Sequence, residues 1–287
     1  MSLFIAAGVS FMAGVSVPLI PLVNQRTVTT ETGLEQQQQS EPNILEITPL
    51  IEQQQHAYQQ LIAKLPLQTE KELTFSVPDQ FQGKTVYKVG FSNKDKIIAL
   101  TFDDGPWPKT TNEVLYILKK HNIKATFFVL GTNVKNYSGR LKQIVEHGHA
   151  IGNHSWSHPY TYQNPSAAAL EIDRTEDLLY KTSGVKTSLF RPPGGFLNNG
   201  LAAYARKTNH AVVLWSSDSR DYYASEQKLL NNVLKQAQSG GIILLHDGGG
   251  DRSETVRALP KLITELKQRG YKFVTVPELL EIAADTK

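Results

Sequence analysis

The chain contains the stretch Ile97-Ile98-Ala99-Leu100-Thr101-Phe102-Asp103-Asp104-Gly105-Pro106, in which a run of apolar and β-branched residues ends in two adjacent carboxylates. The run has the length and composition of a strand that is buried on both faces. Such a strand delivers Asp103 and Asp104 together to its carboxyl end. Two like charges at one strand end push each other's pKa values apart unless a cation lies between them. The stretch therefore predicts a buried strand that leads into a cation site.

Strand-like and helical patterns alternate along the rest of the chain. Helical patterns such as Thr111–His121, Ala167–Lys181 and Glu254–Arg269 separate the apolar runs. This alternation indicates a parallel α/β sheet. The further strand-like runs are Ala125–Leu130, Ala150–Asn153, Ser188–Phe190, Ala211–Trp215, Gly241–Leu245 and Tyr271–Val276.

Chemically useful side chains stand at or just after the ends of five of these runs. In a β/α barrel, the carboxyl ends of the strands form the face that carries the active site. Five separate strands that deliver such residues to one rim predict a catalytic site there. The residues are the Asp103 and Asp104 pair, His154, Arg191, Asp218 and His246.

The N-terminal part of the chain divides into three segments. Residues 1–23 are expected to be a signal or membrane-anchor segment, because residues 3–23 are largely apolar, uncharged and long enough to cross a bilayer. Residues 24–45 are polar and Gln/Thr-rich, which is typical of a disordered linker. Residues 46–90 should form an elaboration with a helix from Pro49 to Leu65 and short strands, and residues 91–287 the main domain. We therefore expect an exported protein, either membrane-anchored or secreted.

The composition excludes several classes of function. The chain has 287 residues, no cysteine and a formal net charge of +3. Without cysteine there are no disulfides, thiolate metal ligands or cysteine nucleophile. The basic residues are scattered, and the lack of a Lys/Arg block argues against nucleic-acid binding. Nothing in the sequence indicates a protein partner.

A second motif is His154-Ser155-Trp156-Ser157-His158. On a helical turn, two histidines four residues apart lie on one face, as metal ligands require. A lone pair of this kind more often decorates a surface, but Asp104 adds a carboxylate ligand. Two imidazoles and one carboxylate predict one divalent metal with open coordination positions. Zn²⁺ fits these ligands best, and Mn²⁺, Co²⁺, Ni²⁺ or Fe²⁺ also fit them.

A third motif is Arg191-Pro192-Pro193-Gly194-Gly195, directly after a strand. Such a sequence forms a rigid turn. In addition, Arg191 is a fixed cation that can hold Asp103 ionised and oriented. The backbone N–H groups of Gly194 and Gly195 can stabilise an oxyanion.

Two more motifs complete the rim. Leu244-Leu245-His246 ends a buried strand, and a histidine there is a good general acid, although it could also only hydrogen-bond a loop. The segment Trp215–Tyr222 places Asp218 and Asp221 at the rim, and one of them could serve only as a helix cap.

In this order, the five motifs resemble those of the polysaccharide deacetylases of carbohydrate esterase family four, which carry a NodB-homology domain. The resemblance covers about Lys96 to Val276, and five motifs in order are specific where any one alone would be weak. It implies an α/β fold, a distorted (β/α) barrel with about seven parallel strands and its active site at the carboxyl ends of the strands.

The resemblance also implies a role for each matched residue. The metal ligands would be Asp104, His154 and His158. The catalytic residues would be Asp103 as general base, Arg191 as its positioning partner, His246 as general acid, and Asp221 in preference to Asp218 as the residue that orients His246. The substrate-binding residues would be Pro193, Gly194, Tyr222 and Leu244, with Leu244 in the acetyl pocket.

Two positions depart from the family's pattern. Gly194 stands where members often have an aromatic residue, so the groove is expected to lose a wall while the backbone N–H remains. Tyr222 stands where members have a tryptophan. Both changes affect substrate fit and leave the metal ligands and proton-transfer groups in place.

We therefore expect a metal-dependent hydrolase that removes N-acetyl groups from an N-acetylglucosamine-containing polysaccharide, peptidoglycan or a chitin-like polymer, and releases acetate. Two alternatives remain open, beside the weaker one of a metal-dependent esterase of small metabolites. The same site could serve an O-acetyl esterase acting on xylan-type polymers. A non-catalytic glycan-binding barrel is the other, although the intact motif residues argue against it.

Overall fold

The computed structural model describes residues 53, 72–91 and 95–286. The expected signal or anchor segment, the linker and nearly all of the helix expected from Pro49 to Leu65 lie outside these residues. Among the described residues, no helix is both long and apolar enough to span a membrane.

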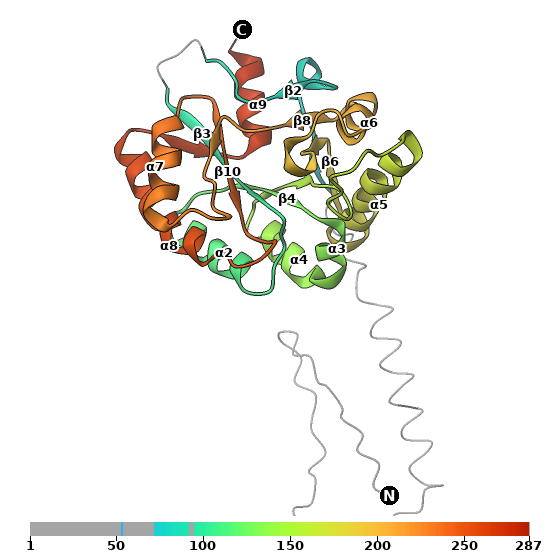
Figure 1. Cartoon of the computed structure of the whole chain (residues 1–287), viewed down its shortest axis with the longest axis horizontal. Helices are drawn as coiled ribbons and strands as arrows, with labels where there is room; N and C mark the ends of the chain where they lie inside the picture. Colours follow the sequence, from blue (N-terminus) through green and yellow to red (C-terminus); the bar gives the residue numbers. More distant parts are fainter. Residues whose placement is uncertain (1–52, 54–71, 92–94, 287) are drawn as a thin grey trace, which may run out of the picture. The chain divides into compact units, whose positions relative to one another are not determined.

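The described part of the chain is built around one curled sheet of nine parallel strands (Figure 1). The sheet contains the seven strands predicted after residue 95 and two short ones, β2 and β9, at the ends of its pairing path. β2 lies in the region 46–90, where short strands were expected. This arrangement confirms the expected α/β fold with parallel strands. The order is β2 (Thr85–Val86), β8 (Ala211–Val213), β7 (Leu189–Phe190), β5 (Ala150–Asn153), β4 (Thr126–Val129), β3 (Ile97–Asp103), β10 (Gly241–His246) and β9 (Ser217–Asp218), with β11 (Lys272–Val274) also paired to β3.

Two elements of the region before residue 91 join this body. β2 belongs to the main sheet through β8. β1 (Leu73–Phe75) pairs with β6 (Val185–Thr187) in a separate two-stranded parallel sheet. A short 3-10 helix, η1 (Asp79–Phe81), lies between them in the chain.

Helices pack against one another around the sheet (Figure 1). Neighbouring pairs are α7 with α8, α8 with α2, α2 with α4, α4 with α5, α3 with α5, and α5 with α6. Their bounds are α2 (Thr110–Lys120), α3 (Gly131–Asn136), α4 (Ser138–Glu146), α5 (Pro165–Ser183), α6 (Leu201–Lys207), α7 (Glu226–Gln236), α8 (Ser253–Gln268) and α9 (Val276–Asp285).

The last predicted strand is shorter than its apolar run. The run Tyr271–Val276 is extended only over β11, because Thr275 caps α9. Thr275 Oγ1 accepts the backbone N–H of Glu278, whose carboxylate in turn accepts the N–H of Thr275. A reciprocal capping box of this kind is a strong helix start and overrides the β-branched run before it.

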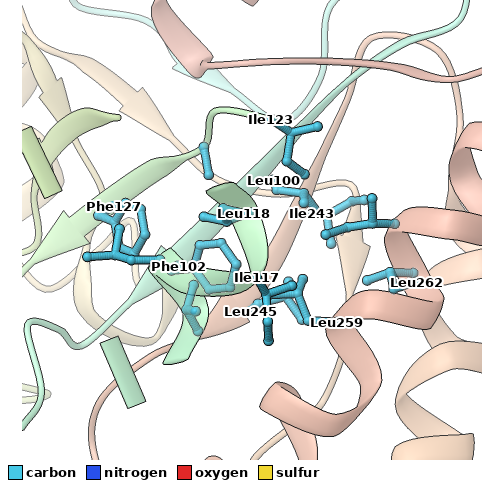
Figure 2. Close-up of a cluster of buried hydrophobic side chains, with 14 of the residues drawn as sticks. Leu100, Phe102, Ile117, Leu118, Ile123, Phe127, Ile243, Leu245, Leu259 and Leu262 are labelled. Atoms are coloured by element: carbon cyan, nitrogen blue, oxygen red, sulfur yellow. The ribbon is translucent and has the colours of Figure 1, made fainter. Parts of the chain in front are cut away.

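The central strands β3 and β10 are buried along their whole length. Phe102 of β3 stacks on Phe127 of β4, with ring centroids 5.1 Å apart, inside a cluster that also includes residues of α2, β10 and α8 (Figure 2). The parallel register pairs Asp103 with His246. Packing of the core therefore places two of the predicted site residues at the same level of adjacent strands.

Gly152 provides a test of how tightly β5 packs against β4. A Cβ atom at Gly152 would lie 2.4 Å from ring atoms of Phe128. We expect Gly152→Ala to lower the free energy of unfolding by about 1–3 kcal/mol, because a buried ring must move. Urea denaturation measures this change.

The matched control is Gly139→Ala in α4, where no atom lies within 4 Å of the Cβ position. Alanine should stabilise this helix by about 0.5–1 kcal/mol. Equal effects of the two substitutions would contradict the packing described for Gly152.

Candidate active site

The two adjacent carboxylates stand at the carboxyl end of β3. Asp103 is the last residue of the strand, and Asp104 follows it with a φ of 67°. Their exposed fractions are only 2% and 5%. Asn133 Nδ2 donates a hydrogen bond to the Asp104 carbonyl at 2.7 Å and fixes the turn. Aspartate tolerates such a left-handed conformation better than most residues, and the turn lets the two carboxylates face different partners.

Asp103 is held by Arg191. The guanidinium Nη1 donates to Asp103 Oδ1 at 2.7 Å and to Thr101 Oγ1 at 2.8 Å. Its Nε and Nη2 donate to the carbonyls of Val213 and Leu214. Arg191 is completely buried. A guanidinium with four hydrogen bonds is a rigid cation, so it keeps Asp103 in one orientation.

His154 and His158 converge on Asp104. Their Nε2 atoms lie 3.5 and 3.4 Å from the same oxygen, Asp104 Oδ1. His154 Nδ1 donates to the Arg191 carbonyl at 2.7 Å. This bond fixes the tautomer of His154 and leaves the lone pair of Nε2 directed toward the carboxylate.

A loop, and not the predicted helical turn, brings the two histidines together. Ser155 and His158 have φ values of 72° and 60°, which no helix contains. Glu171 of α5 accepts the backbone N–H groups of Trp156 and Ser157 at 2.9 and 2.8 Å. Ser155 Oγ accepts the N–H of His158. The prediction of a helical turn is wrong because side-chain acceptors bind these N–H groups and bend the chain.

Asp104, His154 and His158 fit a metal ion. One ligand atom of each lies within 4.8 Å of the others. Among the described residues, Asp104 Oδ1 is buried without any hydrogen-bond partner. Such an oxygen is costly to bury unless a cation neutralises it. Burial and the neighbouring His154 lower the pKa of His158, which favours the neutral imidazole that binds metals.

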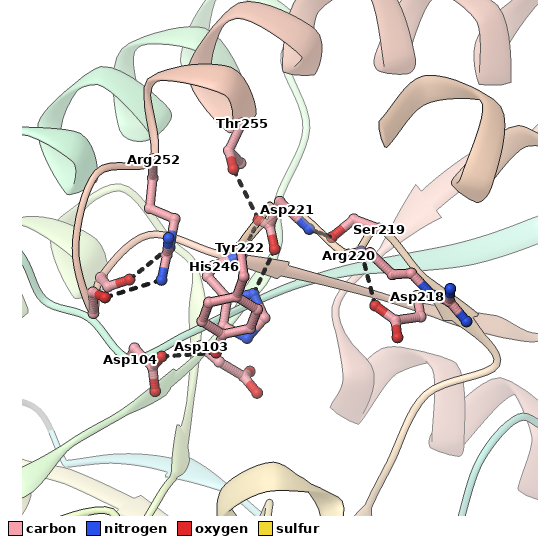
Figure 3. Close-up of polar contacts among 12 residues, drawn as sticks. Asp103, Asp104, Asp218, Ser219, Arg220, Asp221, Tyr222, His246, Arg252 and Thr255 are labelled. Atoms are coloured by element: carbon pink, nitrogen blue, oxygen red, sulfur yellow. Dashed lines mark hydrogen bonds and ion pairs between the residues drawn. The ribbon is translucent and has the colours of Figure 1, made fainter. Parts of the chain in front are cut away.

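His246, at the end of β10, forms a buried pair with Asp221 (Figure 3). The Nδ1 and Oδ1 atoms are 2.7 Å apart, while Asp221 Oδ2 accepts the backbone N–H of His246 and the hydroxyl of Thr255. Burial alone would lower the pKa of His246, but the hydrogen bond and charge of Asp221 raise it above its usual value. Burial alone would raise the pKa of Asp221, and the bond to His246 lowers it. The contacts thus favour an imidazolium beside a carboxylate.

Asp218 has a different partner. Its Oδ1 accepts the backbone N–H of Arg220 at 2.9 Å, and it lines the same cavity as His246. Asp221 is therefore the aspartate that contacts the imidazole, as expected.

A cavity of about 200 Å³ opens beside these groups. Three of the four predicted substrate contacts, Gly194, Tyr222 and Leu244, line it, and Pro193 is buried in the adjoining 3-10 helix η2 (Pro193–Gly195). The N–H of Gly195 donates to the Pro192 carbonyl at 2.9 Å. Gly195 is thus already engaged, and Gly194 is the better candidate of the two for an oxyanion contact.

An aromatic wall beside Gly194 was not predicted. Gly194 has a φ of 60°, and a Cβ atom there would lie 3.0 Å from the ring of Phe196 and 3.1 Å from that of Tyr160. The two rings meet edge to face with centroids 6.0 Å apart, and Tyr160 contacts the ring of His158 in the same way at 4.9 Å. Tyr160 and Phe196 lie on separate loops, so no sequence spacing indicates that they join.

The sequence of the chain is similar to those of known polysaccharide deacetylases. The family profile described as polysaccharide deacetylase matches residues 91–213. A peptidoglycan-N-acetylglucosamine deacetylase of Bacillus cereus is 46% identical over 192 residues, which are 66% of this chain and 90% of the relative. The peptidoglycan-N-acetylmuramic acid deacetylase PdaC of Bacillus subtilis is 40% identical over 189 residues, 65% of this chain and 39% of the relative.

Among solved structures, the Bc1960 peptidoglycan N-acetylglucosamine deacetylase superposes with a TM-score of 0.65 and 36% identity, covering 70% of this chain and 94% of that one. The five motifs occur in the expected order, and their residues meet at the carboxyl ends of the parallel strands. The similarity covers 90% of the Bacillus cereus relative and 39% of PdaC. The chain belongs to the polysaccharide deacetylase family.

Proposed function

We propose that this protein hydrolyses N-acetyl groups on a peptidoglycan glycan and releases acetate. The observation that carries the proposal is the convergence of three groups on one cavity. These are an arginine-bound carboxylate, an Asp-His-His ligand set and a histidine paired with a carboxylate. The relatives named above act on peptidoglycan, which favours this glycan over chitin-like polymers. A substrate of the cell wall also supports export of the enzyme, with residues 3–23 as anchor or signal.

Asp104, His154 and His158 would hold the metal, and Zn²⁺ is the ion we propose. Two imidazoles and one carboxylate, with room for water and substrate, match its catalytic sites. When bound, the ion supplies Lewis-acid polarisation of the acetyl carbonyl and lowers the pKa of a water molecule.

Asp103 would act as the general base. Its side chain lines the cavity. Arg191 binds Oδ1 and fixes the orientation of the carboxylate, while Oδ2 lies 3.7 Å from His154 Nε2. The ion pair with Arg191 holds the carboxylate in place to take a proton from the attacking water. The backbone N–H of Gly194 would stabilise the negative charge that develops on the acetyl oxygen.

His246 would act as the general acid. Its Nδ1 is bound by Asp221, so Nε2 is the nitrogen that remains for the substrate. The raised pKa of His246 favours the protonated imidazole, which can donate its proton to the leaving amine. Leu244, two residues earlier on the same strand, would contact the acetyl methyl group.

The function is tested by acetate release from N-acetylglucosamine oligomers, from peptidoglycan and from acetylxylan. We expect release from the first two, loss of at least about 100-fold on chelation, and recovery with zinc, because the metal supplies much of the rate. Preference for acetylxylan would favour the O-acetyl esterase alternative. Absence of release from all three, with zinc bound, would favour a glycan-binding barrel.

Asp103→Asn tests the general base. We expect kcat to fall by about 10²–10⁴-fold, since the amide cannot accept the proton. Zinc content measured by atomic absorption should stay at the wild-type level, because the proposed ligands are untouched. Activity near that of the wild type would contradict the role of Asp103.

Asp221→Asn tests the pairing with His246 through the pH dependence of kcat. The general acid must be protonated, so a raised pKa extends activity to higher pH. Removing the negative charge lowers that pKa, and the alkaline limb should move to lower pH by about one unit or more. Asp218→Asn is the matched control and should leave the limb in place, whatever its effect on kcat. A limb that moves equally in both variants would contradict the assignment.

A further inference from the structure

Tyr222 contacts both halves of the proposed machinery (Figure 3). Its hydroxyl donates a hydrogen bond to Asp104 Oδ2 at 3.1 Å. Its ring lies against the imidazole of His246, with ring centroids 4.1 Å apart. One side chain therefore reaches a proposed metal ligand and the proposed general acid together.

The hydroxyl binds the oxygen of Asp104 that the histidines leave free. Oδ1 faces the Nε2 atoms of His154 and His158, at 3.5 and 3.4 Å, and Oδ2 accepts from Tyr222. Rotation of this carboxylate would break the hydrogen bond from Tyr222 and turn Oδ1 away from the two imidazoles. Groups that hydrogen-bond a metal ligand in this manner orient it and commonly change metal affinity by about 10–100-fold.

The ring is itself held in place. The guanidinium of Arg252 lies 4.4 Å from the centroid of the Tyr222 ring. Arg252 is almost fully buried and donates hydrogen bonds to the carbonyls of Gly248, Gly249 and Asp251. This cation is fixed to the loop that follows β10, the strand that carries His246. Tyr222, whose side chain is half exposed, thus packs between the ring of His246 and the guanidinium of Arg252, and the loop after β10 joins these two residues.

We propose that Tyr222 is a positioning residue, which holds Asp104 in its metal-binding orientation through the hydroxyl and restrains the imidazole of His246 through the ring. This inference deepens the proposed function and rests on its metal site and general acid. It gives Tyr222 a role beyond the substrate contact expected from the sequence.

Tyr222→Phe and Tyr222→Leu separate the two contributions, since the first removes only the hydroxyl and the second also removes the ring. The readout for the hydroxyl is the Kd for Zn²⁺, measured without substrate by competition with a chromogenic chelator. We expect both variants to bind zinc about tenfold more weakly than the wild type. The readout for the ring is kcat for acetate release at saturating zinc. It should be at least about tenfold lower in Tyr222→Leu than in Tyr222→Phe, because a misplaced acid slows proton transfer.

The matched control is Tyr204→Phe, which removes another tyrosine–aspartate hydrogen bond, from Tyr204 to Asp173 at 2.7 Å on the surface. Its zinc affinity and kcat should equal those of the wild type. Urea unfolding of the zinc-free proteins verifies that each variant is folded, and Tyr222→Phe alone tests the hydroxyl if Tyr222→Leu is not.

Two results would overturn the inference. A zinc Kd of Tyr222→Phe within twofold of the wild type would remove the role in metal binding, and equal kcat values for Phe and Leu would remove the role of the ring. Zinc binding does not depend on which substrate is hydrolysed. A wild-type protein that binds zinc and releases no acetate would therefore refute the proposed function and still leave the comparison of zinc affinities decisive.

Discussion

The burial of two neighbouring carboxylates is the constraint on which the rest of the site depends. Asp103 and Asp104 end a strand that is buried throughout, and charges placed there are costly unless each has its own partner. Asp103 receives a fully buried guanidinium. Within the described part of the chain, Asp104 forms no ion pair with a lysine or arginine. Two imidazoles and a phenol surround it, and one of its oxygens has no hydrogen bond there. The two carboxylates differ in chemistry because the fold compensates them differently.

The sheet also sets the distance between the two buried groups that are proposed to transfer protons. Asp103 and His246 are register partners on adjacent buried strands, so core packing places the proposed base and the proposed acid relative to each other. A shift of one residue in this pairing would turn the apolar side chains of β10 away from their present neighbours, which the buried environment forbids. The loops then complete the site by supplying Arg191, the histidines and Asp221. The buried strands β3 and β10 thus carry the proposed proton-transfer groups, and the loops supply the side chains that bind these groups.

This division also explains what the sequence could predict. Apolar runs located seven strands of the main sheet, and the polar residues after them indicated the candidate site, because both depend on patterns that are local in the chain. The loop conformation of His154–His158 was missed, since it depends on the Glu171 carboxylate of a helix that comes later in the chain. The hydroxyl bond from Tyr222 to Asp104 was missed for the same reason: it joins residues far apart in sequence. Sequence spacing indicated the proposed ligands, and tertiary contacts hold their side chains together.

At the two positions where the sequence departs from the pattern expected of the family, Gly194 and Tyr222, neighbouring groups compensate for the change. An aromatic side chain at position 194 would need a left-handed backbone and would also collide with the rings of Tyr160 and Phe196, so the glycine and these two rings require one another. The wall next to the cavity is then built from Tyr160 and from Phe196, which directly follows the turn after Arg191. At position 222, tyrosine retains an aromatic ring against His246 and adds a hydroxyl that reaches Asp104. Both substitutions leave the catalytic groups where the fold places them, and both change the surfaces next to these groups. Tyr160 and Tyr222 line the cavity beside the proposed ligands and the proposed proton-transfer pair, so we expect these two side chains to affect which substrate fits.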